Sequence, residues 1–179
     1  MQINANVKVP RPTGKWEILK WNLLKGETEA DAEVIKQDNL ITDAAIKLMF
    51  KLSAAYGIFG LGYSGDTYKI SVSTDTTTPY ASVAAGYSIG NLATSNISLS
   101  DPTSGAIRTS TGSCYFFETG AAGADVGKVI NSIRVGAASA APSDHVFAWL
   151  KLASPITLAA GDAIKVNCSF SMTDSASCS

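Results

Sequence analysis

The amino-acid sequence predicts a mainly β protein: an antiparallel β-sandwich, jelly-roll or immunoglobulin-like, with an N-terminal β-hairpin and one amphipathic helix. Three observations support this prediction. Short segments of alternating polar and apolar residues recur from Tyr68 to Met172, and turns rich in Ser, Thr, Gly and Pro separate them. Only one segment has the three- and four-residue apolar spacing of a helix. Many short strands after a single helix are typical of two packed antiparallel sheets.

The first part of the chain predicts the hairpin. Fifteen of the 29 charged residues lie in positions 1–51, so this part meets different surroundings from the rest. Lys15–Leu24 alternates apolar and charged residues as a strand with one apolar face does. Gly26 and the acidic stretch Glu27–Asp31 predict a turn, and Glu33–Leu40 can return as the second strand.

The segment Ile41–Tyr56 predicts the helix. Thr42 or Asp43 can cap its N-terminus, and Gly57 follows as a stop signal. One face would carry Ala45, Leu48, Met49 and Leu52. We therefore expect a hairpin-plus-helix module in residues 1–60, a β-sandwich in 61–174 and a flexible tail in 175–179, together forming one compact domain.

The later strands follow from alternation and turn signals. We expect them at Tyr68–Ser73, Ile97–Leu99, Ala106–Ser110, Ser113–Glu118, Val129–Val135, His145–Leu152 and Ala163–Met172. In the last of these, Ile164, Val166 and Cys168 point to one side. A slip of one residue would bury Lys165 and Asn167 instead, so the register of this strand is well specified.

The composition excludes several classes of function. The chain has 179 residues, 46% of them hydrophobic, which suffices for a domain that needs neither a disulfide nor a metal to be stable. Its formal net charge is −1, so it lacks the basic excess that neutralises a phosphate backbone, and we expect no nucleic-acid partner. The N-terminus does not resemble a signal peptide, and no apolar run reaches the about eighteen residues of a bilayer crossing. We therefore expect no membrane partner.

No segment matches a catalytic or metal-binding pattern. His145 is the single histidine and has no cysteine at ligand spacing, so we expect it to be structural or solvated. Gly62–Asp66 has its second glycine one residue too early for a nucleophile turn, and the glycines of Gly57–Gly65 follow a helix where a phosphate loop would precede one. We expect solvated loop carboxylates at Glu118, Asp125 and Asp162. The sequence thus predicts no enzyme, no metal and no cofactor.

The three cysteines, Cys114, Cys168 and Cys178, are odd in number and lack C-x-x-C spacing. This pattern favours reduced thiols, with a bridge between Cys114 and Cys168 as the alternative.

Two tryptophans in the hairpin are candidate interface residues. Trp16 and Trp21 are five positions apart, so they would lie on opposite faces of a regular strand. Either both belong to the core, with a bulge between them, or at least one is exposed and packs on a partner, since aromatic residues are enriched at interfaces.

A succession of motifs extends from about position 15 to 172. After a Trp-containing strand and a Gly-centred turn come Asn39–Ala45 (NLITDAA), Lys69–Thr74 (KISVST), Thr76–Ala81 (TTTPYA), Ile133–Gly136 (IRVG), Phe147–Leu152 (FAWLKL) and Ser154–Asp162 (SPITLAAGD). In this order the motifs resemble those of small β-sandwich proteins of tailed-bacteriophage virions. The sequence departs from them at Ala44 and Ala45, where such proteins often carry glycine.

The resemblance implies a non-enzymatic structural subunit of a phage particle, either capsid decoration or cement or a tail or neck component, assembled in the cytoplasm of the host bacterium. Its partners would be further copies of itself and other virion proteins, such as major capsid, portal or tail proteins. Trp16, Trp21 and Leu23 would then dock on a neighbouring subunit. A surface with few charges suits close packing of many copies, because little ion desolvation opposes each contact.

A second class of function is a carbohydrate-binding adhesin or receptor-binding module. In that case Tyr80 and Tyr87, in the hydroxyl-rich loops, would stack on sugar rings, and a glycan array would distinguish the two classes.

Overall fold

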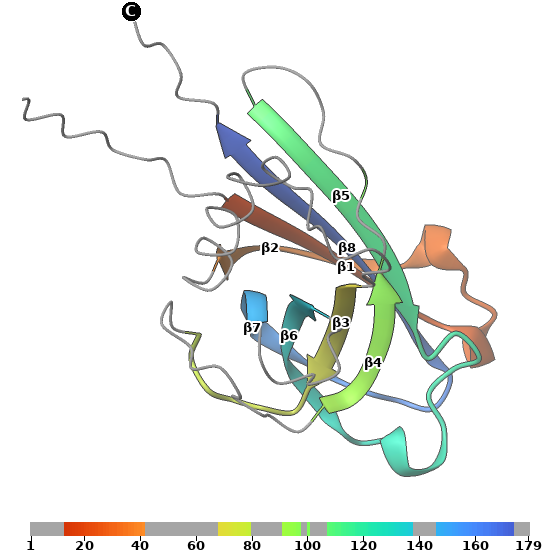
Figure 1. The fold of residues 1–179 in the computed structure, drawn as a ribbon. Coiled ribbons are helices and arrows are strands. Elements are labelled where there is room, and N and C mark those ends of the chain that lie inside the picture. Colours follow the sequence, from red (N-terminus) through yellow and green to blue (C-terminus); the bar gives the residue numbers. More distant parts are fainter. Residues whose placement is uncertain are drawn as a thin grey trace, which may run out of the picture.

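The computed structural model describes residues 13–41, 68–79, 91–97, 100, 107–137 and 146–173. These residues form eight strands: β1 (Thr13–Asn22), β2 (Glu33–Ile41), β3 (Tyr68–Ser73), β4 (Asn91–Ile97), β5 (Ile107–Phe116), β6 (Val129–Ala137), β7 (Val146–Thr157) and β8 (Asp162–Thr173). The strands make two antiparallel sheets of four (Figure 1). The predicted class, mainly β with two packed antiparallel sheets, is confirmed.

The first sheet, sheet A, has the strand order β2-β1-β8-β5. β1 pairs with β2 in the predicted hairpin, with Ile18 opposite Ile35. On its other side β1 pairs with β8 without interruption, from Thr13 opposite Ser171 to Asn22 opposite Asp162. The hairpin is therefore half of a sheet that it shares with strands from the second part of the chain.

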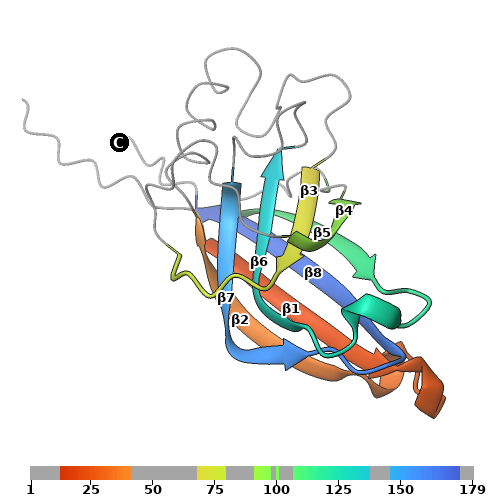
Figure 2. The same ribbon diagram turned by 90° about the horizontal axis from the view of Figure 1, so that it is seen from below.

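The second sheet, sheet B, has the order β4-β3-β6-β7 and lies in front of sheet A in Figure 2. The sheets meet at one corner, where Ile41 of β2 pairs with Ala148 of β7. Beside this short ladder, Gln37 Nε2 donates to Lys151 O at 2.6 Å and Gln37 Oε1 accepts from Ala153 N at 3.0 Å.

At the other corner, Ser100 follows β4 and binds β5. Its backbone N donates to Thr111 O at 2.8 Å, and its carbonyl accepts from Ser110 Oγ at 2.6 Å. The two sheets are thus connected along both sides.

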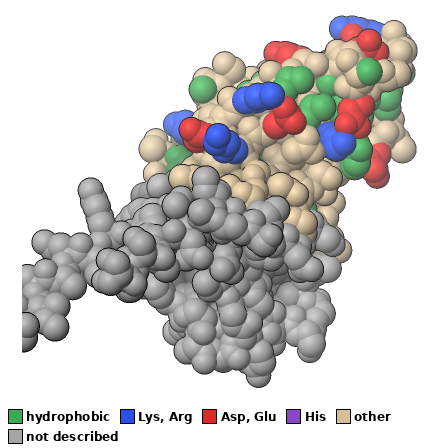
Figure 3. Space-filling model, turned by 90° about the horizontal axis from the view of Figure 1, so that it is seen from above, with side chains coloured by type: hydrophobic (Ala, Val, Ile, Leu, Met, Phe, Trp, Pro, Cys, Tyr) green, Lys and Arg blue, Asp and Glu red, His purple; other side chains and the backbone are tan. Residues whose placement is uncertain are grey.

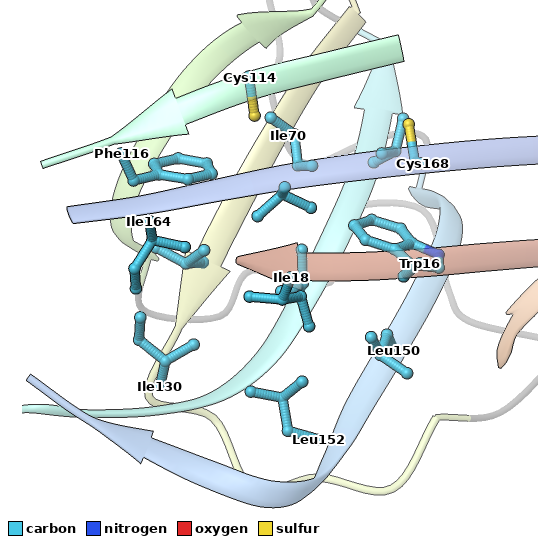
Figure 4. Close-up of a cluster of buried hydrophobic side chains, with 14 of the residues drawn as sticks. Trp16, Ile18, Ile70, Cys114, Phe116, Ile130, Leu150, Leu152, Ile164 and Cys168 are labelled. Atoms are coloured by element: carbon cyan, nitrogen blue, oxygen red, sulfur yellow. The ribbon is translucent and has the colours of Figure 1, made fainter. Parts of the chain in front are cut away.

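The core fills the space between the sheets (Figure 4). Sheet A and sheet B contribute comparable sets of apolar side chains, among them Trp16, Ile18, Ile70, Cys114, Phe116, Ile130, Leu150, Leu152, Ile164 and Cys168. In β8, Val166 and Cys168 are buried while Lys165 and Asn167 are partly exposed, which confirms the predicted register.

Several predicted boundaries are wrong. β1 ends at Asn22 and not at Leu24, and β7 continues to Thr157, beyond the predicted Leu152. Ile41 ends β2 instead of beginning a helix, and the rest of the predicted helix lies outside the described residues. The two strands predicted at 106–110 and 113–118 form one strand, because Gly112 pairs with Cys168 and the ladder with β8 continues through it. β4 covers Asn91–Ile97, whereas only its last residue was predicted as strand. Within the described residues, no helix has the length and apolar character needed to span a membrane.

Candidate functional site

Three connections meet at one end of the sandwich, which we call the loop end (residues 23–32, 117–128 and 158–161). Backbone hydrogen bonds join them: Leu23 N donates to Gly161 O at 2.9 Å, Gly161 N to Ala121 O at 2.9 Å, and Gly127 N to Leu158 O at 2.8 Å. Because each connection binds another, the loop end is a continuous, hydrogen-bonded surface.

A buried polar network fixes the first of these connections. Asn22 Nδ2 donates to Asp162 Oδ1 at 2.8 Å and to Ala160 O at 2.9 Å. Asn22 Oδ1 accepts from Leu24 N at 3.1 Å and Lys25 N at 3.2 Å, which caps the short 3-10 turn that begins at Leu23. Gly26 then reverses the chain with a φ of 75°, a left-handed conformation that favours glycine.

Asp162 is the acceptor at the centre of this network. Its Oδ2 accepts from Ala159 N at 2.8 Å and forms an ion pair with Lys20 Nζ at 3.0 Å. Burial disfavours its ionised form, but the hydrogen bonds from Ala159, Lys20 and Asn22 outweigh burial and hold the pKa of Asp162 below its usual value. The prediction that Asp162 is solvated is wrong, since only 2% of it is exposed.

The connection between β1 and β2 folds over the outer face of sheet A. Glu29 Oε1 lies 2.5 Å from Lys165 Nζ, and Glu29 Oε2 accepts from the Tyr115 hydroxyl at 3.1 Å. Trp21 packs edge-to-face on Tyr115, with ring centroids 6.4 Å apart. The hydrogen bond from Lys165 lowers the pKa of Glu29, and the same bond raises the pKa of Lys165.

The loop end exposes apolar side chains. Leu24 is 77% exposed, Val126 43% and Leu23 39%. The backbone beneath the two leucines is held by Asn22 and Gly161, so these side chains project from a fixed support. Leu24 and Val126 were not singled out from the sequence, although the pair Leu23-Leu24 just before Gly26 is a signal that a turn presents two leucines.

The outer face of sheet A carries rows of polar side chains and is hollowed. Two rows of side chains cross its four strands, the first made of Lys36, Glu17, Asn167 and Ser113. The second, one pleat away, is made of Asp38, Lys15, Ser169 and Thr111. All eight residues line one open hollow, which we call the sheet A hollow. Figure 3 views this side of the molecule and shows basic and acidic side chains interspersed.

The predicted interface residues are placed as follows. Trp16 is 2% exposed and Trp21 is 8% exposed, so neither is an exposed docking residue. Both are thus buried within the chain itself, as the first alternative expects. They point to opposite faces of β1, as their spacing predicts, and the expected bulge is absent because the pairing of β1 has no register shift. Leu23 is exposed as expected, while Tyr80, Tyr87 and His145 lie outside the described residues.

Cys114 and Cys168 are free thiols in the core, as the number and spacing of the cysteines favoured. Burial raises the pKa of both to about 12, so they are unreactive in the folded protein. Among the side chains that the structure describes, no group of three His, Cys, Asp or Glu residues is arranged to hold a metal ion.

No protein-family model, curated protein or solved structure matches the chain significantly.

Proposed function

We propose that the protein is a non-enzymatic structural subunit of a bacteriophage particle and that it assembles by protein–protein contact through the loop end. The order of sequence motifs supports the phage particle, and the geometry of the loop end supports the mode of action. Its partners would be further copies of the chain or other virion proteins.

The observation that carries the proposal is the exposure of Leu23 and Leu24 on a rigid support. Burying a leucine against a partner contributes about 1.5–3 kcal/mol. Asn22 and Gly161 already fix the backbone that carries the leucines, so binding orders little additional chain and less conformational entropy opposes it.

Because both tryptophans are buried, other residues of the hairpin would form the contact. Trp21 lies beneath the β1–β2 connection and supports it from inside, whereas Leu23 and Leu24 reach solvent. We therefore assign the proposed interface of the N-terminal hairpin to its turn and not to its tryptophans.

The first test is mass spectrometry of purified phage particles whose genome encodes this chain. We expect the chain in the particles at a fixed copy number, and its absence from them would refute the proposal.

The second test replaces Leu24 by Asp, which places a charge in the contact. Because the side chain is 77% exposed, Leu24→Asp should fold normally and lower the copy number per particle by about tenfold or more. Thr94→Asp, at an exposed position of β4 in sheet B, is the matched control and should be incorporated like the unaltered chain. Equal incorporation of both variants would place the contact elsewhere.

A further inference from the structure

We infer that the sheet A hollow is a binding site for a neutral oligosaccharide, separate from the loop end. This inference adds a ligand site to the proposed structural role and stands on different residues.

The charge of the hollow indicates a neutral ligand. The two rows contain two lysines, Lys15 and Lys36, and two acids, Glu17 and Asp38. Lys36 Nζ lies 3.0 Å from Glu17 Oε1, and Lys15 stands opposite Asp38 in the ladder. With its charges balanced, the hollow has no electrostatic preference for a polyanion or a polycation.

The hydrogen-bonding groups of the hollow fit a polyhydroxylated ligand. Each sugar hydroxyl both donates and accepts, and the rows present carboxylates, ammonium groups, hydroxyls and an amide side by side. Neighbouring strands are about 4.8 Å apart, so such groups recur along each row at short, regular intervals. Consecutive hydroxyls of a saccharide can therefore be bound at once.

The groups are held in place before a ligand arrives. β1 and β8 are the two inner strands of sheet A, each paired on both sides, and they carry Glu17 and Asn167. Asn167 Nδ2 donates to Glu17 Oε2 at 3.1 Å. The hydrogen bond from Lys36 lowers the pKa of Glu17, which favours the ionised carboxylate that accepts hydrogen bonds. Such preorganisation reduces the entropy that binding costs.

The shape and polarity of the hollow disfavour a protein partner. Trp16 and Cys168 belong to the lining, but each is 2% exposed, so neither offers its apolar side chain to a partner. Two hollowed faces also cannot match each other in shape, which disfavours a second copy of the chain.

The test is a ¹H–¹⁵N NMR titration of the isolated, full-length protein. The probes are four neutral oligosaccharides, namely maltoheptaose, mannohexaose, cellohexaose and chitohexaose, with heparin and polyphosphate as anionic probes. We expect saturable shifts of amides in β1 and β8 around Glu17 and Asn167 with at least one neutral probe. No shift with any neutral probe, or binding of an anionic probe to these strands instead, would overturn the inference.

Two variants locate the binding to the hollow. Asn167→Ala and Ser113→Val remove one hydrogen-bonding side chain each from solvent-facing positions of central and outer strands, and each should weaken binding by about tenfold. Thr94→Val, on β4 of sheet B, is the control and should bind like the unaltered protein. Unchanged affinity in both hollow variants would refute the site. The measurement uses no phage particles, so its failure and the failure of the structural role are distinguishable.

Discussion

The carboxylate of Asp162, at the start of β8, binds two other parts of the chain. Lys20 and Asn22 come from β1, about 140 positions earlier, and Ala159 lies in the turn that precedes β8. The sequence indicates the turn, because Gly161 comes directly before Asp162, but it carries no sign of partners so distant along the chain. This is why a loop acid that was expected in solvent is buried.

The lowered pKa of Asp162 predicts the sign of an acid dependence. A carboxyl whose pKa is lower in the folded than in the unfolded state stabilises the fold above its unfolded pKa, which is about 3.9 for an ordinary Asp. This contribution is lost as the pH falls through the folded pKa. Glu17, Glu29 and Asp31 also have lowered pKa values and act in the same direction.

We predict that Asp162→Ala lowers the free energy of unfolding by about 2–4 kcal/mol near neutral pH, because it leaves buried donors without an acceptor. The variant should also lose less of its free energy of unfolding than the unaltered protein as the pH falls from about 5 to about 2. Urea unfolding of both proteins across this pH range measures the effect. Asp125→Ala, which breaks an exposed ion pair with Lys128, is the control and should cost less than about 0.5 kcal/mol. Equal losses in the two variants would contradict the role of Asp162.

β1 uses both of its faces for burial. Trp16 enters the core between the sheets, while Trp21 is buried outside sheet A under the connection that Glu29 holds to Lys165. The five-residue spacing predicts the opposite faces correctly. It cannot predict that the chain folds back over the second tryptophan, because that depends on Lys165 and Tyr115 of other strands.

We predict that Trp21→Ala lowers the free energy of unfolding by about 2–4 kcal/mol, since it removes a large buried side chain and its contact with Tyr115. Urea unfolding followed by circular dichroism measures the loss without relying on tryptophan fluorescence. Leu24→Ala, at a mostly exposed position, should change stability by less than about 0.5 kcal/mol. A Trp21→Ala protein as stable as the unaltered one would mean that this side chain faces a partner after all.

The strands differ in how well local sequence predicts them. β3 and β8 alternate clearly between apolar and polar residues, and their predicted bounds agree with the structure closely. β4 reads Asn-Leu-Ala-Thr-Ser-Asn-Ile and has little intrinsic strand preference, so its pairing with β3 determines its conformation. Gly112 suggests a break in β5, but continuous pairing with β8 overrides it.

The two described thiols report on the integrity of the whole sandwich. Cys114 and Cys168 come from adjacent strands of sheet A and face the same core, and burial raises the pKa of each to about 12. Only an opening of the two sheets can expose them to a reagent.

We predict that a Cys178→Ser variant does not react with a thiol reagent such as DTNB near neutral pH while it is folded, and that both remaining thiols react once urea unfolds it. The fraction of reactive thiol should follow the loss of circular dichroism at each urea concentration. Rapid labelling of the folded variant would show that the sheets separate locally. The Cys178→Ser change also excludes a signal from the third cysteine.

The two poles of sheet A carry different parts of the chain. Thr13 begins β1 beside Ser171 near the end of β8, while Asn22 and Asp162 lie together at the other end of the same two strands (Figure 1). Ten residues of strand place these ends about 30 Å apart. The chain therefore enters β1 and leaves β8 at the pole remote from Leu23 and Leu24. A subunit anchored by those leucines would hold this pole on its free side.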